Sequence, residues 1–125
     1  MNGLFPVMIG GAIGAGARHL VGGAILARLD PGFPWGTLSI NIVGSLLMGL
    51  LVGWLARSGG TEMVRLFIGV GLLGGFTTFS AFSLEFWTLF ERGQSAQAFI
   101  YVVASVIGAI AGCGIGLLVM RQVPA

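Results

Sequence analysis

Four long apolar segments alternate with short polar stretches along the chain. The segments cover residues 4–28, 36–56, 63–90 and 95–120, and the stretches around them hold most of the charged side chains. A helix needs about 20 residues to cross the hydrocarbon core of a bilayer, so each segment is long enough to span a membrane. The pattern predicts an all-α integral membrane protein with four transmembrane helices in a single domain, residues 1–125.

Composition excludes a soluble fold. The chain is 56% hydrophobic and 8% charged, whereas about a quarter of the residues in an average soluble domain are charged. The net charge of +2 comes from scattered arginines without any basic run, so nothing favours nucleic acid as a partner. The first apolar segment is too long for a cleavable signal peptide, and we expect it to stay as the first span.

The middle of the third segment is unusually rich in small and polar residues. Gly71, Gly74 and Gly75 precede Thr77 and Thr78, and both residue types weaken a helix. The cluster predicts a break near mid-depth, although a helix with a glycine packing face would explain it too. Broken backbone is tolerated in a membrane only where it is buried in protein or lines a cavity, and its freed carbonyls can bind a cation.

Aromatic and hydroxyl side chains follow this cluster in two parallel rows. Phe79 and Phe82 share one helical face, and Ser80 and Ser83 form the second row. Aromatic ring edges carry partial positive charge, so a small anion could pass along ring edges and hydroxyls. Core packing or lipid contact would explain the phenylalanines equally well.

The other segments hold a few isolated polar residues. Arg18 lies well inside the first segment, where an arginine costs about 2.5–3.5 kcal/mol unless it faces water or a partner; it either snorkels or lines an anion-accessible cavity. Asn41 needs a partner for its amide, either on a neighbouring helix or on a passing anion. Tyr101 and Ser105 lie four residues apart on one face and either extend a polar path or bond to another helix.

The arginines are almost balanced across the membrane. With four spans, Arg57, Arg65 and Arg121 lie on one side, and Arg28 and Arg92 lie on the other. Because Lys and Arg in the loops set orientation, three against two gives either a weak bias or insertion in both orientations. Four short helices cannot enclose an aqueous pathway and still pack against each other, so we expect an oligomer. If both orientations coexist, an antiparallel homodimer is favoured.

Several motifs resemble those of the CrcB/Fluc fluoride channels. They are "GGAIGAGARH" in the first segment, "PWGTLSINIVGSLLMG" in the second and above all "GLLGGFTTFSAFSLE" in the third. The resemblance covers essentially the full length. It implies an antiparallel, dual-topology homodimer in the cell membrane, with two fluoride pathways that export cytoplasmic fluoride passively. It also implies a structural sodium ion at the dimer centre.

The resemblance assigns roles to individual residues of this chain. The backbone carbonyls of Gly74 and Thr77 would hold the sodium ion. The remaining matched positions would line or adjoin the fluoride pathway: Phe79, Phe82, Asn41, Arg18, Tyr101, Ser105, Ser80, Ser83 and Thr37. Some relatives have a serine where this chain has Ala109, which leaves the end of the polar row on the fourth segment open.

Enzymatic chemistry finds no support in the sequence. It has no cluster of metal-ligating residues with the required spacing and no nucleophile beside a base. The rival function is a small proton-coupled exporter, either a fluoride/proton antiporter or a small multidrug-type exporter. Such a protein needs a titratable group in the membrane, and only Glu85, near the end of its segment, or His19 could serve.

Overall fold

The computed structural model describes residues 2–124, and within them four helices are long and apolar enough to cross a membrane. The first two are α1, Leu4–Leu26, and α2, Trp35–Ser58, and the last is α6, Ser95–Gln122. The third span, Glu62–Glu91, is composite: α3 (Glu62–Val64), the π-helix η1 (Arg65–Leu73), α4 (Gly74–Phe76) and α5 (Phe79–Glu91). The predicted all-α architecture with four spans is confirmed, and the predicted helix ends lie within two residues of the observed ones.

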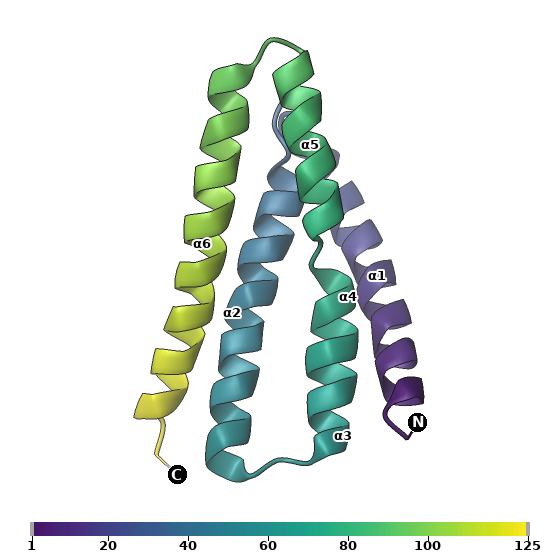
Figure 1. The fold of residues 1–125 in the computed structure, drawn as a ribbon, viewed down its shortest axis with the longest axis vertical. Coiled ribbons are helices and arrows are strands. Elements are labelled where there is room, and N and C mark those ends of the chain that lie inside the picture. Colours follow the sequence, from purple (N-terminus) through teal and green to yellow (C-terminus); the bar gives the residue numbers. More distant parts are fainter. Residues whose placement is uncertain (1, 125) are drawn as a thin grey trace.

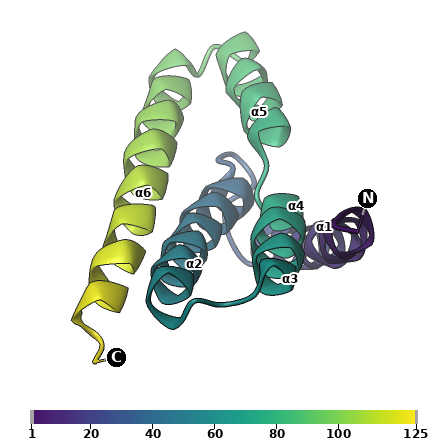
Figure 2. The ribbon, with the colours of Figure 1, turned by 60° about the horizontal axis from the view of Figure 1, so that its bottom comes forward.

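The helices form an open bundle in which α1 and α6 lie on opposite flanks (Figures 1 and 2). Both described chain ends and the connection between α2 and α3 lie at one end of the bundle, here called the terminal end (Figure 1). The connections α1–α2 and α5–α6 lie at the other end. The helix α2 packs along α6, while η1 and α4 pack against α1.

Glycines allow these helices to approach each other at backbone distance. A Cβ atom added to Gly116 of α6 would lie 2.6 Å from the backbone nitrogen of Leu50 in α2. A Cβ atom on Gly75 of α4 would lie 2.6 Å from the carbonyl oxygen of Gly11 in α1. Both distances are far below van der Waals contact, so any side chain at these positions would force the helices apart. Close packing of small residues supplies much of the association energy of helices in lipid.

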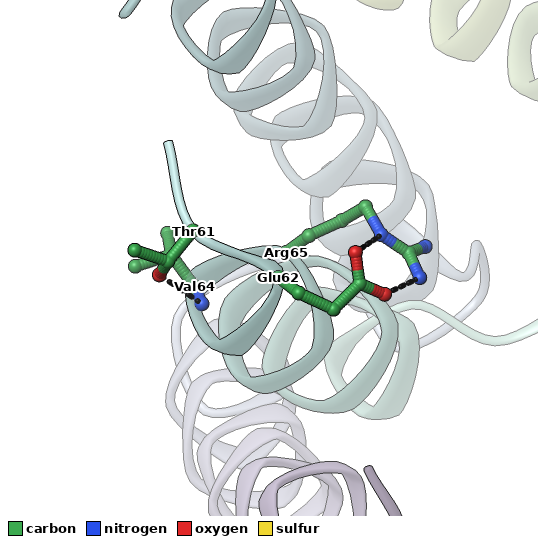
Figure 3. A network of polar contacts seen from close by, with 4 residues as sticks. All are labelled: Thr61, Glu62, Val64 and Arg65. Atoms are coloured by element: carbon green, nitrogen blue, oxygen red, sulfur yellow. Dashed lines mark hydrogen bonds and ion pairs between the residues drawn. The ribbon is translucent and has the colours of Figure 1, made fainter. Parts of the chain in front are cut away.

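A small polar network marks the start of the third span (Figure 3). The Thr61 hydroxyl accepts a hydrogen bond from the backbone N–H of Val64 at 3.2 Å and so caps the helix. The guanidinium of Arg65 donates twice to the Glu62 carboxylate, through Nε at 3.3 Å to Oε2 and through Nη2 to Oε1. Because this ion pair is exposed, it contributes little energy, but the cap defines where the span begins.

The third span changes its neighbour at two residues with extended backbone. Thr77 has φ −83° and ψ 157°, and Thr78 has φ −150° and ψ 125°; we call this pair the threonine link. Before the link, η1 and α4 pack against α1; after it, α5 packs against α6 (Figure 1). The link therefore shifts the span from one flank of the bundle to the other.

Candidate functional site

The diagonal course of the third span leaves one cavity on each side of it. A cavity of about 470 Å³, here called the vestibule, lies among α1, α2, α5 and the α1–α2 connection. A cavity of about 430 Å³, here called the groove, lies among α2, α4, α5 and α6. Charged side chains gather in the vestibule: Arg18, Asp30, Glu85 and Arg92 line it, together with His19. The groove is lined by apolar, hydroxyl and amide side chains.

Asn41 of α2 is bound to the threonine link. Its Nδ2 donates to the carbonyl oxygen of Thr78 at 2.9 Å, and its Oδ1 accepts from the backbone N–H of Thr78 at 2.8 Å. One amide side chain thus pairs with both polar groups of an extended residue, which a helix would otherwise satisfy internally. Of the two interpretations of Asn41, pairing with a neighbouring segment is what the structure shows. The same side chain also lines the groove.

The link leaves several carbonyl groups without their helical donors. The N–H of Thr78, which a continuous helix would direct to Gly74, donates to Asn41 instead. The N–H of Ala81, the helical donor for Thr77, donates to the Thr78 hydroxyl at 3.2 Å. The carbonyl of Gly75 accepts from Nε of Arg18 at 3.3 Å. In the described residues no group of three His, Cys, Asp or Glu side chains could hold a metal.

Glu85 of α5 joins hydroxyls from two other helices. Its Oε2 accepts from Thr37 of α2 at 3.0 Å, and its Oε1 accepts from Tyr101 of α6 at 3.1 Å. Glu85 and Thr37 line the vestibule, whereas Tyr101 is fully buried. The carboxylate therefore ties three helices together at the side of the vestibule.

An aromatic row continues from Tyr101 to the surface. The rings of Tyr101 and Phe82 lie 5.1 Å apart, and those of Phe82 and Phe79 lie 5.3 Å apart. Phe82 is 8% exposed and Phe79 is 78% exposed. Both phenylalanines line the groove, where Ser105 also lies. The Ser105 hydroxyl is buried and makes no hydrogen bond within residues 2–124.

The structure divides the residues predicted from the sequence into three groups. Asn41, Gly74, Thr77, Phe79, Phe82 and Ser105 line the groove. Arg18 and Thr37 line the vestibule. Ser80, Ser83 and Tyr101 line neither cavity: Ser80 lies 3.3 Å from the Thr78 hydroxyl, Ser83 donates to the Phe79 carbonyl at 2.9 Å, and Tyr101 bonds to Glu85.

Sequence reasoning gave no individual role to Thr78 and left that of Glu85 open. Thr78 is the N-cap of α5, since its hydroxyl accepts from Ala81 three residues later. A threonine just before the "FSAF" helix is a recognisable cap signal. For Glu85 no such signal exists, because both of its partners come from other helices.

Known proteins resemble this chain along its full length. A family model described as CrcB-like protein, Camphor Resistance (CrcB), matches residues 5–117. The protein of Sphingopyxis alaskensis named fluoride-specific ion channel FluC is 73% identical over 126 residues, which cover 100% of both chains. Proteins of the same name from Mesorhizobium japonicum and Caulobacter vibrioides are 55% and 50% identical, over at least 98% of each chain.

Proposed function

The chain belongs to the CrcB family, and from this membership we propose that it is a fluoride-specific ion channel. The observation that carries this conclusion is 73% identity, over the whole of both chains, to a protein named for that function. The chain is a multi-pass membrane protein and not an enzyme. We place it in the inner or plasma membrane, where passive export of cytoplasmic fluoride would reduce fluoride toxicity.

The cavities offer the groups that a small, strongly hydrated anion needs. Arg18 lines the vestibule and attracts anions from water. Phe79 and Phe82 line the groove, where their ring edges would favour an anion, and the buried Ser105 hydroxyl there makes no hydrogen bond in the described chain. The proposed pathway also includes the hydroxyls of Thr37, in the vestibule wall, and of Tyr101, Ser80 and Ser83 on α5 and α6. A membrane potential is worth about 2.3 kcal/mol per charge per 100 mV, so a passive channel suffices to drive an anion out of the cell.

A second copy of the chain would complete the groove. Its wall includes Phe79, Val106 and Ile110, which are 78%, 46% and 68% exposed. Apolar side chains beside hydroxyl and amide groups pack better against a protein surface than against lipid. A second copy of the chain supplies such a surface. The near balance of the arginines favours an antiparallel arrangement, with two pathways per homodimer. Lipid covers the remaining apolar faces.

The threonine link suits a structural sodium ion. The carbonyls of Gly74 and Thr77 have lost their helical donors to side chains, and unwound backbone carbonyls are known Na⁺ ligands in membrane proteins. Gly74 is exposed on the single chain, so the same two carbonyls from an antiparallel copy would make four oxygen ligands. When bound, the ion would offset the partial negative charges of these carbonyl oxygens.

Efflux from liposomes tests the channel function. Purified protein is reconstituted into liposomes loaded with either fluoride or chloride, and ion-selective electrodes follow release after a potassium ionophore is added. We expect fast fluoride release with negligible chloride release. If fluoride stays trapped although the protein is folded and inserted, the channel function is wrong.

Glu85 is the observation that keeps proton-coupled fluoride export as the second candidate. It is a carboxylate within a membrane span, held by Thr37 and Tyr101. An antiporter would move fluoride under a pH gradient without any ionophore, whereas a channel responds to voltage. The same liposomes with an imposed pH gradient and clamped voltage therefore separate the two functions.

The sodium and dimer proposals have separate tests. Protein purified without sodium should unfold at a lower temperature in potassium buffer than in sodium buffer of equal ionic strength, because only sodium would fill the carbonyl site. Equal unfolding temperatures in both buffers would contradict the site. Cross-linking in liposomes, combined with labelling from one side, should give dimers whose two chains expose opposite ends; uniform exposure would contradict the antiparallel arrangement.

A further inference from the structure

Thr78 lines both cavities. It belongs to the wall of the vestibule and also to the wall of the groove. The helix α2 passes from one cavity wall to the other beside Thr78. Thr37 lines the vestibule, and Asn41, one turn later, lines the groove. Thr78 therefore lies at the boundary between the two cavities.

The first turns of α5 divide in the same way. Ala81 and Glu85 line the vestibule, whereas Phe79 and Phe82 line the groove. Thr78 is the cap residue from which these two faces diverge. An ion that moves from the charged vestibule to the aromatic groove must pass from one face of α5 to the other, and Thr78 stands at the point where they meet.

Four hydrogen-bond contacts fix Thr78 in this position. Asn41 holds its N–H and its carbonyl, and the Thr78 hydroxyl accepts from the N–H of Ala81 and lies 3.3 Å from the Ser80 hydroxyl. Threonine is also β-branched, which restricts rotation about χ1. The side chain at the boundary is thus held in one orientation.

We propose that Thr78 forms the partition between vestibule and groove, and that its size sets which anions cross. This inference rests on the proposed channel function. Fluoride is smaller than chloride, so a rigid partition excludes chloride more strongly. Replacing Thr78 by serine removes a methyl group and makes the partition smaller, while the serine hydroxyl can still cap α5. Chloride, the larger ion, gains more from the added space than fluoride does.

Paired threonine-to-serine variants provide the test. Thr88 is the matched control: it lies on α5, lines the vestibule alone of the two cavities, and its hydroxyl donates to the carbonyl of Leu84 at 2.9 Å. In the liposome assay we expect Thr78→Ser to raise the ratio of chloride to fluoride release about tenfold, since one carbon atom is typically worth that much discrimination. Thr88→Ser should leave the ratio at the wild-type value. An unchanged ratio in Thr78→Ser, or an equal change in both variants, overturns the proposal.

A blocking experiment tests the same partition without relying on selectivity. The chain has one cysteine, Cys113, so Thr78→Cys and Thr88→Cys are made in a Cys113→Ala background and treated with an anionic methanethiosulfonate in detergent before reconstitution. We expect modification to abolish fluoride release in Thr78→Cys and to leave most of it in Thr88→Cys. Full release from completely modified Thr78→Cys overturns the partition.

A failure of the partition can be told apart from a failure of the channel function. The unmodified wild-type protein is measured in the same preparation, and if it releases no fluoride, the channel function fails together with the partition. If it releases fluoride normally while the Thr78 variants behave like their Thr88 controls, only the partition fails. Each variant is checked for folded protein by its thermal unfolding, and where Thr78→Ser does not fold, the Thr78→Cys variant decides.

Discussion

Replacing Asn41 by alanine should destabilise the fold as well as impair conduction. The change removes both hydrogen bonds to Thr78, at 2.9 Å and 2.8 Å. It leaves an N–H and a carbonyl in extended backbone at membrane depth. Since both groups adjoin the groove, water can reach them and reduce the cost of losing their partner.

The expected loss follows from these two bonds. A hydrogen bond contributes about 1 kcal/mol net in soluble proteins and about 0.6 kcal/mol on average between membrane helices. Loss of the two bonds therefore lowers the free energy of unfolding by about 1–2 kcal/mol. Incomplete hydration of the Thr78 backbone groups adds to this loss. We expect the free energy of unfolding to fall by about 2 kcal/mol, with fluoride release reduced because the link no longer has one fixed conformation.

Titration with sodium dodecyl sulfate in mixed micelles measures this difference. The control is Ser45→Ala, which changes another polar side chain of α2 on the groove wall without touching the Thr78 backbone. A loss below about 0.5 kcal/mol in Asn41→Ala, the usual range for surface substitutions, would refute the reasoning. So would an equal loss in Ser45→Ala.

Three further predictions concern other contacts. Gly116→Ala should lower the unfolding free energy by about 1–3 kcal/mol, because its Cβ atom would lie 2.6 Å from the nitrogen of Leu50, whereas Gly114→Ala, whose Cβ atom would meet nothing within 4 Å, should not; the same micelle titration compares them. Arg18→Gln removes one of the two arginines of the vestibule and should slow fluoride release several-fold at low ionic strength and less at high salt, as efflux at two salt concentrations would show. Glu85→Gln keeps one acceptor for the hydroxyls but removes the charge. In a channel, fluoride release driven by voltage should persist in this variant. If the variant loses only the fluoride movement driven by a pH gradient, the antiporter is favoured.

The four spans could be predicted because lipid imposes one simple rule. A segment that crosses the bilayer must be apolar and about 20 residues long, and this signal is local in the sequence. The four-residue spacing of Gly108, Gly112 and Gly116 indicates a close helix contact on α6, but not that its partner is α2. The glycines of α1 were less informative: Gly10 and Gly14 are buried against η1, whereas a Cβ atom on Gly16 would meet nothing within 4 Å.

Pairing between distant side chains could not be predicted. Asn41 offered two interpretations because its partner, the backbone of Thr78, is 37 residues away. Glu85 has partners 48 and 16 residues away. Spacing reveals which residues share a helical face, but the partner across a helix interface depends on rotation and tilt, which periodicity does not encode. The diagonal course of the third span likewise comes from α4 and α5 packing on different neighbours.

Polar side chains in this membrane domain divide into those that complete the fold and those that the described chain leaves unpaired. Asn41 and Arg18 satisfy backbone groups near the threonine link, which lipid alone could not do. The Ser105 hydroxyl, by contrast, is buried without a hydrogen bond in the described chain, and an unpaired buried hydroxyl costs about 1–3 kcal/mol. Such a cost contributes nothing to the fold of a single chain. It is recovered if an anion in the groove accepts that hydrogen bond, so Ser105→Ala should slow fluoride release while leaving unfolding unchanged or slightly more difficult.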